Sequence, residues 1–87
     1  MPVSSTNIVE RIARVIAGRV ISSNAGGDDP SAGERVDSVW RDYAGDAVSI
    51  LRTLREPDEA MAAAGDVAIW ERMIEAALAE AQEGAAA

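Results

Sequence analysis

Neither cysteine nor histidine occurs among the 87 residues of the chain. Without cysteine there can be no disulfide framework, no thiolate metal site and no cysteine nucleophile. Without histidine the chain also lacks the commonest transition-metal ligand and the commonest general base. Because these absences remove most catalytic chemistry, we expect a protein that is not an enzyme and that uses neither a metal nor another cofactor.

Lysine is also missing, so all eight basic side chains are arginine, against fifteen acidic side chains and a net charge of −7. Residues 1–22 hold three arginines and one acid, whereas residues 23–87 hold five arginines and fourteen acids. An acidic body is repelled by nucleic acid and by anionic membranes, so direct binding to either is not expected. The charge is compatible with a basic protein partner and equally with solubility alone.

Long apolar runs are absent too, since no run approaches the ~20 residues that span a bilayer. The opening "MPVSSTNIVERI" does not show the basic and then apolar order of a secretory signal. A composition heavy in alanine, arginine and aspartate is typical of a bacterial or phage gene. We therefore expect one small domain over residues 1–87, located in the cytoplasm of a bacterial host.

Helical periodicity recurs in three segments of the sequence. "NIVERIARVIAGRVI" predicts a helix over 7–22 that is capped by Asn7. "RVDSVWRDYAGDAVSILRTLREP" predicts one continuous helix over 36–56, and "DVAIWERMIEAALAEAQEG" predicts another over 66–83. Residues 22–35 read as a linker loop, and residues 1–6 and 84–87 as frayed ends.

The stretch "LREPDEAMAAAGD" combines four acids with a proline and a glycine. Such acids can line a metal loop, but each of them also suits a helix end. Pro57 cannot continue the preceding helix and fits the first position of a new one. Gly65 is typical of a C-terminal cap, and Asp66 of the next N-cap. The stretch therefore predicts a corner containing a short helix over 57–64.

Together these segments predict an all-α fold, a small bundle of three principal helices plus a short helix started by proline. The expected core consists of the large apolar residues on the helix stripes: Trp40, Tyr43, Leu51, Leu54, Trp70 and Ile74. Trp40 and Tyr43 could instead form an aromatic recognition patch, but their place in the apolar stripe favours the core.

Two acidic groups could suggest chemistry. Asp28, Asp29 and Glu34 lack the ligand spacing of a calcium loop. Glu56 and Glu59 could act as an acid and a base, although both are also explained as residues at helix ends. No catalytic or metal-binding residue is predicted.

The run "VWRDYAGDAVSILRTLREPDEAMAAAGD", followed by "IWERMIEAALAE", resembles a set of small uncharacterised proteins of alphaproteobacteria and their phages. The shared pattern falls on Trp40, Tyr43, Leu54, Arg55, Glu56, Pro57, Met61, Ala64, Gly65, Trp70, Met73, Ile74, Ala77 and Leu78. Those proteins often have an "ADG-x-x-P" loop where this chain has "NAGGDDP". The resemblance implies an association with phages or other mobile elements, but it brings no assigned activity.

Two functions are compatible with these features. The first is a non-enzymatic helical module that binds another protein, with a second copy of the chain as a further candidate partner. The alternative is an acidic inhibitor or decoy of a nucleic-acid-binding host defence enzyme, as anti-CRISPR proteins are. Candidate contact residues are Asp42, Asp46, Glu71 and Glu75 for a basic partner, and Ile69 and Arg19 for a packed one. Arg19 could equally extend from the last helical turn to solvent.

Overall fold

The computed structural model describes residues 3–24 and 32–86, with side chains for 3–23 and 33–82. The described chain is helical and contains no strand, which confirms the all-α prediction. Its elements are α1 (Ile8–Asn24), α2 (Ala32–Val39), the 3₁₀ helix η1 (Trp40–Tyr43), α3 (Ala44–Leu54), α4 (Glu59–Ala64) and α5 (Val67–Ala86).

The helices extend further than the sequence predicts. The cap of α1 is confirmed, because the Asn7 Oδ1 atom accepts a hydrogen bond of 2.8 Å from the Glu10 N–H. However, α1 continues to Asn24 and α2 already begins at Ala32, so both enter the predicted linker over 22–35. Residues 84–86 belong to α5 rather than to a separate end. The acids at 28 and 29 lie outside the described residues.

The predicted continuous helix over 36–56 is wrong, because the structure divides it at η1. Val39, which precedes η1, and Tyr43, which ends it, have ψ angles of −6° and 5°, outside the α-helical range. The resulting bend lets α2, η1 and α3 all pack against α1. Tertiary packing therefore overrides the helical periodicity that the sequence shows through this segment.

The core lies where α1 crosses α3 and the middle of α5. Its buried side chains are Val9, Ala13, Ala17, Ile21, Ala47, Leu51 and Ile74, and Leu51 is the largest of those with almost no exposure. Trp40, Tyr43 and Trp70 are partly buried, and all three pack against this cluster. Leu54 is 38% exposed, so its assignment to the core is wrong. It ends α3, beyond the reach of α1.

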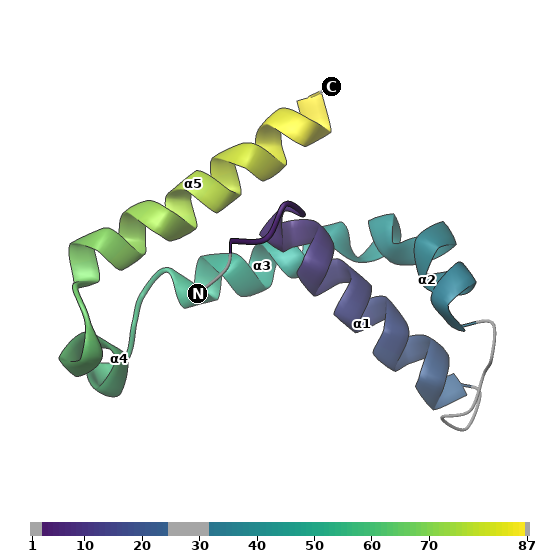
Figure 1. Cartoon of the computed structure of the whole chain (residues 1–87), viewed down its shortest axis with the longest axis horizontal. Helices are drawn as coiled ribbons and strands as arrows, with labels where there is room; N and C mark the ends of the chain where they lie inside the picture. The colour runs from purple at the N-terminus through teal and green to yellow at the C-terminus, as the bar shows by residue number, and fades with distance from the viewer. Residues whose placement is uncertain (1–2, 25–31, 87) are drawn as a thin grey trace.

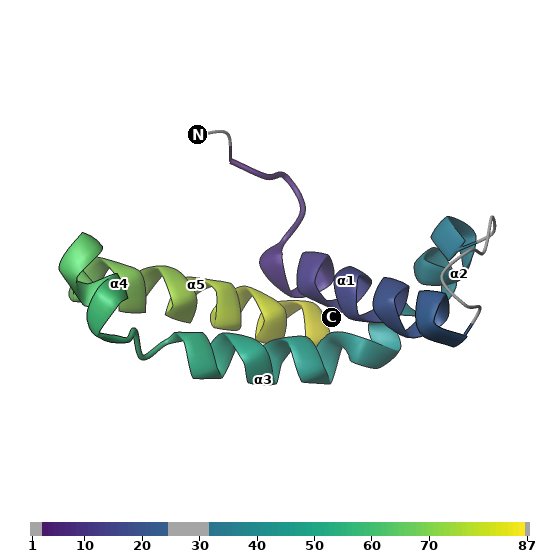
Figure 2. The same ribbon diagram turned by 90° about the horizontal axis from the view of Figure 1, so that it is seen from below.

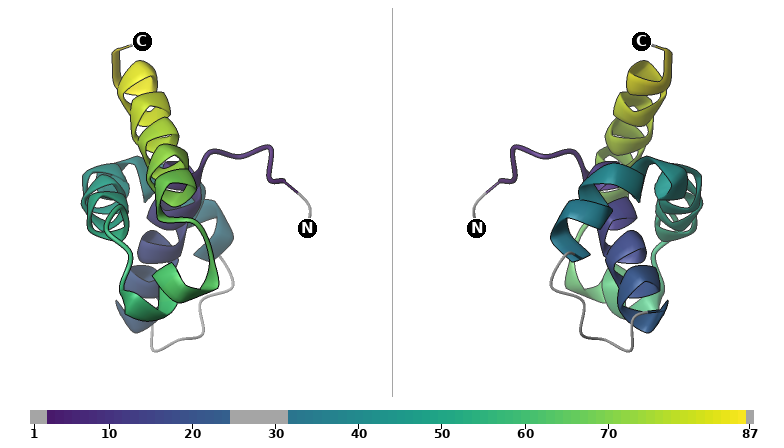
Figure 3. Two further views of the ribbon diagram at one scale, coloured as in Figure 1. Left: turned by 90° about the vertical axis from the view of Figure 1, so that its left-hand side faces the viewer. Right: turned by 90° about the vertical axis from the view of Figure 1, so that its right-hand side faces the viewer.

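Figure 1 shows α5 running back antiparallel to α3, with α4 at the far end of the pair. Figure 2 shows the same pair from below, extending well past α1 toward α4. Figure 3 shows the N-terminal segment projecting from the helices. The Cα radius of gyration is 15.0 Å, whereas a compact domain of this length has about 12 Å. The molecule is therefore open, with an arm of α3, α4 and α5 beyond the core.

The corner between α3 and α5 differs in detail from its prediction. The short helix is present, but its N-cap is Asp58, whose Oδ1 atom accepts a 2.9 Å hydrogen bond from the Met61 N–H. Pro57 precedes this cap instead of starting the helix. Gly65 is the C-terminal cap of the short helix, as predicted, and it has an extended conformation with φ −160° and ψ −157°. The cap at Asp66 is confirmed by a 3.1 Å bond from the Ile69 N–H.

Candidate protein-contact surfaces

No cluster of acidic side chains that could hold a metal occurs in the part of the chain that the structure describes. The same residues include no buried polar or charged side chain. Glu56 and Glu59, the acid pair considered for catalysis, are both exposed. In the described ranges, no helix has the length and apolar character that crossing a membrane requires.

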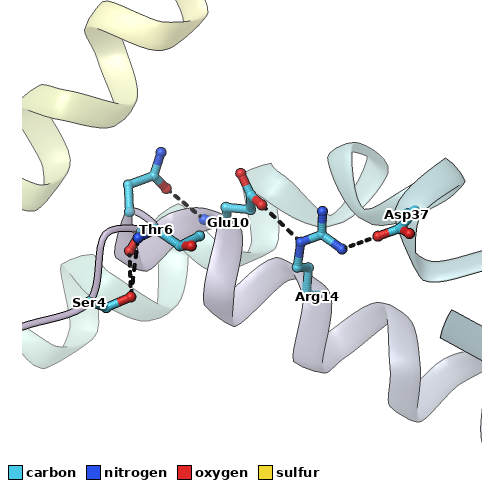
Figure 4. A network of polar contacts seen from close by, with 6 residues as sticks. Ser4, Thr6, Glu10, Arg14 and Asp37 are labelled. Carbon is cyan, nitrogen blue, oxygen red and sulfur yellow. Dashed lines mark hydrogen bonds and ion pairs between the residues drawn. The ribbon is translucent and has the colours of Figure 1, made fainter.

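Arg14 forms the main polar contact between helices (Figure 4). Its guanidinium donates to Glu10 on the same helix at 2.9 Å and to Asp37 on α2 at 2.5 Å. These two hydrogen bonds, with Asp37 the larger influence, raise the pKa of Arg14 above its ordinary value. Asp37 thus joins α1 to α2.

Trp40 lies between two guanidinium groups. The Cζ atom of Arg14 is 5.4 Å from the centre of the Trp40 ring, and that of Arg41 is 4.6 Å away. Both distances are within the range of cation–π attraction. The contact of Arg14 with Trp40 joins α1 to η1, and its ion pair with Asp37 joins α1 to α2, so this cluster has a structural role.

The four predicted acidic contact residues are all exposed. The structure does not gather them into one site. Asp42 and Asp46 lie at η1 and the start of α3, whereas Glu71 and Glu75 lie on the part of α5 near the end of α3. Glu75 also shares the lining of a hollow with Arg52 and Arg55, which offset its charge. Asp42 and Asp46 remain the better candidates for a basic partner.

The two residues predicted for a packed partner are also exposed, but in different surroundings. Arg19 is exposed near the end of α1, consistent with a side chain that extends to solvent. Ile69 is 47% exposed on α5 and lines a hollow of about 360 Å³ between α4 and the first turns of α5. The structure therefore favours Ile69 as a contact residue.

We call the lining of this hollow the corner surface: Pro57, Met61, Ala62, Ala64, Gly65, Asp66, Val67, Ile69, Trp70 and Met73. Met61, Val67, Ile69 and Met73 are large apolar side chains that remain exposed, with Met73 at 61%. Asp66 is the only charged lining residue, and one of its carboxylate oxygens already accepts the Ile69 N–H. The corner surface is therefore apolar, concave and open to solvent.

Trp70 connects this surface to the rest of the arm. Its indole Nε1–H donates a 2.6 Å hydrogen bond to the backbone carbonyl oxygen of Leu54. Carbonyl groups in the last turn of a helix have no partner within that helix. The indole supplies one, and so it fixes the start of α5 against the end of α3.

The helix on the other side of the hollow has little support from its own chain. Every residue from Asp58 to Ile69 is exposed. No other described element packs extensively against α4, which has only six residues. Isolated helices shorter than about 12 residues are marginal in water. The exposed side of α4 is therefore a place where contact with another molecule would add stability.

Sequence reasoning identified Ile69 but missed three other exposed residues of the corner surface. In the sequence, Val67 and Met73 belong to a broad apolar arc of the helix predicted over 66–83, and such an arc normally lies against the rest of a protein. Met61 was treated only as part of a short connecting helix. The width of this apolar arc could have indicated their exposure, because a single neighbouring helix such as α3 covers only part of so wide an apolar side.

Protein-family models, curated proteins and solved structures were each compared with the chain, and none of them matches it. No relative therefore assigns a role to a residue. Among the described surfaces, the corner surface is the one on which exposure, apolar character and weak internal packing coincide.

Proposed function

We propose that this protein acts by binding another protein through the corner surface, without catalysing a reaction. The observation that carries the proposal is the set of exposed apolar side chains around the hollow between α4 and α5. Contiguous exposed apolar patches on small proteins mark interaction sites more often than chance exposure does. The setting proposed for this contact is the cytoplasm of a bacterial host, in a phage or another mobile element.

The composition of the corner surface suits a protein partner. Tryptophan and methionine are enriched at protein interfaces, and charged residues are depleted at their centres. Here the half-buried Trp70 and the exposed Met61 and Met73 surround the hollow, while the one charged side chain is used in a helix cap. A partner that places an apolar side chain in the hollow would bury these groups together, as interface hot spots do.

A second candidate function is the acidic decoy. It is favoured by one observation, the exposure of Asp42 in η1 and of Asp46 at the start of α3, four residues apart in the chain. A basic nucleic-acid-binding enzyme could contact them in place of its usual ligand.

Capture of partners from an alphaproteobacterial lysate tests both candidates. The baits are the wild type, Ile69→Asp, and the double variant Asp42→Arg/Asp46→Arg. Val15→Asp is the matched control, because Val15 is 65% exposed on α1, away from the corner surface. Circular dichroism establishes that each bait has kept its helical content.

We expect Ile69→Asp to lose a partner that the wild type, Val15→Asp and the double variant all retain at low and moderate salt. Loss with the double variant alone, together with steep weakening by salt and competition by DNA, would favour the decoy. If all three variants keep every partner, neither surface is used and both candidate functions are wrong.

A further inference from the structure

We propose that the corner surface holds a second copy of the same chain, so that the protein is a two-fold symmetric dimer through α4 and α5. This inference rests on the proposed function and names its partner. It follows from the exposed area of the chain, from the shape of the corner surface and from the distribution of charge.

The exposed area exceeds what one compact chain would show. The accessible surface is 6342 Å² for a mass of 9.1 kDa, whereas a compact monomer of that mass exposes about 4,900 Å². The excess is about 1,400 Å², and a stable interface of standard size takes about 800 Å² from each partner. The chain therefore has enough uncovered surface to form a stable dimer.

The corner surface offers both exposed apolar side chains and a hollow. Ile69 and Met73 lie one turn apart on α5, are exposed and line the hollow on its α5 side. In a two-fold interface the same patch on both chains must supply both the projecting and the receiving parts. In the proposed dimer, Ile69 and Met73 of each copy face the hollow of the other.

Charge also selects this face for self-association. Each copy has a net charge of −7, so two copies repel one another unless they meet where few charges lie. Asp66 is the single charged residue among those that line the hollow, and its carboxylate is used in the cap of α5. The remaining repulsion comes from acids outside the lining, among them Asp58, Glu59 and Glu71, and salt screens it.

A second copy would also bury apolar surface that a single chain leaves exposed. Leu51 is the one large side chain below 2% exposure among the described residues, and α4 has little packing within its own chain. Small domains with such limited cores commonly gain stability by oligomerisation. A copy of the chain is present wherever the chain is made, so this support does not depend on a different protein.

The test is the molar mass of the full-length protein by sedimentation equilibrium, at low and moderate salt. We expect the wild type to have twice the 9.1 kDa mass of one chain, and its dimer to strengthen with salt as the repulsion is screened. Ile69→Asp should weaken the dimer by at least about tenfold, whereas Val15→Asp should leave it unchanged.

A second variant tests the dimer by cross-linking, so its result does not rely on a substitution that could disrupt the fold. Because the chain has no cysteine, Met73→Cys introduces a single thiol at an exposed position of the corner surface. In the proposed dimer this variant should form a disulfide-linked dimer on mild oxidation, and Val15→Cys should not.

The outcomes separate this inference from the proposed function. A monomeric wild type would overturn the dimer, while capture of a different protein that fails with Ile69→Asp would still support the proposed function. A dimer that survives Ile69→Asp and gives no linkage through Met73→Cys would place the interface elsewhere and overturn the inference. A monomer without any partner that depends on Ile69 would overturn both.

Discussion

The indole nitrogen of Trp70 lies 2.6 Å from the backbone carbonyl oxygen of Leu54 and donates a hydrogen bond to it. This bond closes the corner, because it joins the first turns of α5 to the last turn of α3. Trp70→Phe keeps an aromatic ring but removes the N–H group. We expect the free energy of unfolding to fall by about 1 kcal/mol, the usual net contribution of such a bond.

Urea unfolding of the wild type and of Trp70→Phe measures this difference, with Trp40 as a fluorescent reporter in both proteins. Arg72→Gln is a suitable control, because Arg72 is an exposed neighbour on α5. An unchanged free energy of unfolding in Trp70→Phe would show that the bond does not stabilise the corner.

The second prediction concerns the contact of Asp37 with Arg14. Asp37→Asn should lower the melting temperature by a modest amount, because surface ion pairs contribute little to stability. Asp46→Asn is the control, since Asp46 is equally exposed but forms no ion pair within the described chain. Equal melting temperatures of the two variants would contradict a role for Asp37 in holding α2 to α1.

The pH dependence of this effect follows from Arg14. Asp37 and Glu10 raise the pKa of Arg14 above its ordinary value. A basic group whose pKa is higher in the folded protein contributes its full stabilisation at pH values below its ordinary pKa. It loses this stabilisation only as the pH rises through its pKa in the folded protein. The effect of Asp37→Asn on melting should therefore be the same at about pH 6 and about pH 9. A difference between these pH values would implicate another titrating group.

The third prediction uses Gly65, which is extended and not left-handed. An added Cβ atom would meet nothing within 4 Å. Gly65→Ala should therefore be neutral or should stabilise the protein by up to about 1 kcal/mol, because alanine restricts the unfolded chain. Thermal unfolding measures the change. A loss of stability would contradict the extended conformation of Gly65.

The fourth prediction compares two leucines on α3. Leu51 is 1% exposed and Leu54 is 38% exposed. Leu51→Ala should cost about 2–5 kcal/mol, which is a large part of the stability of a small domain. Leu54→Ala should cost clearly less, because solvent already reaches that side chain. Urea unfolding measures both losses of free energy of unfolding. Losses of similar size in the two variants would mean that Leu54 belongs to the core.

The sequence predicts best those features that depend on neighbouring residues. The caps at Asn7 and Asp66 need only one side-chain oxygen and an N–H three residues later, so their local patterns were sufficient. Asp58 shows the limit of this reasoning. Because proline suits the first position of a helix, the sequence predicts Asp58 within the first turn after Pro57, whereas in the structure its carboxylate caps the helix.

Features set by tertiary packing could not be read from the sequence. No proline marks the division at Trp40–Tyr43, and the apolar spacing continues through it. The bend depends on the packing of α2 and α3 against the same helix. Likewise, the pattern of α5 shows which residues are apolar, but the exposure of Met73 follows from where α3 ends and α4 turns away.

Amide hydrogen exchange across α4 tests most directly whether another copy covers the corner surface. A six-residue helix without packing should open readily, whereas a covered helix is protected by the free energy of association. We expect the amides of Ala62–Ala64 to exchange more slowly as the protein concentration rises, and fast at all concentrations in Ile69→Asp. Protection that is independent of concentration and unaffected by Ile69→Asp would show that α4 is stable within one chain, contradicting the proposed role of the corner surface.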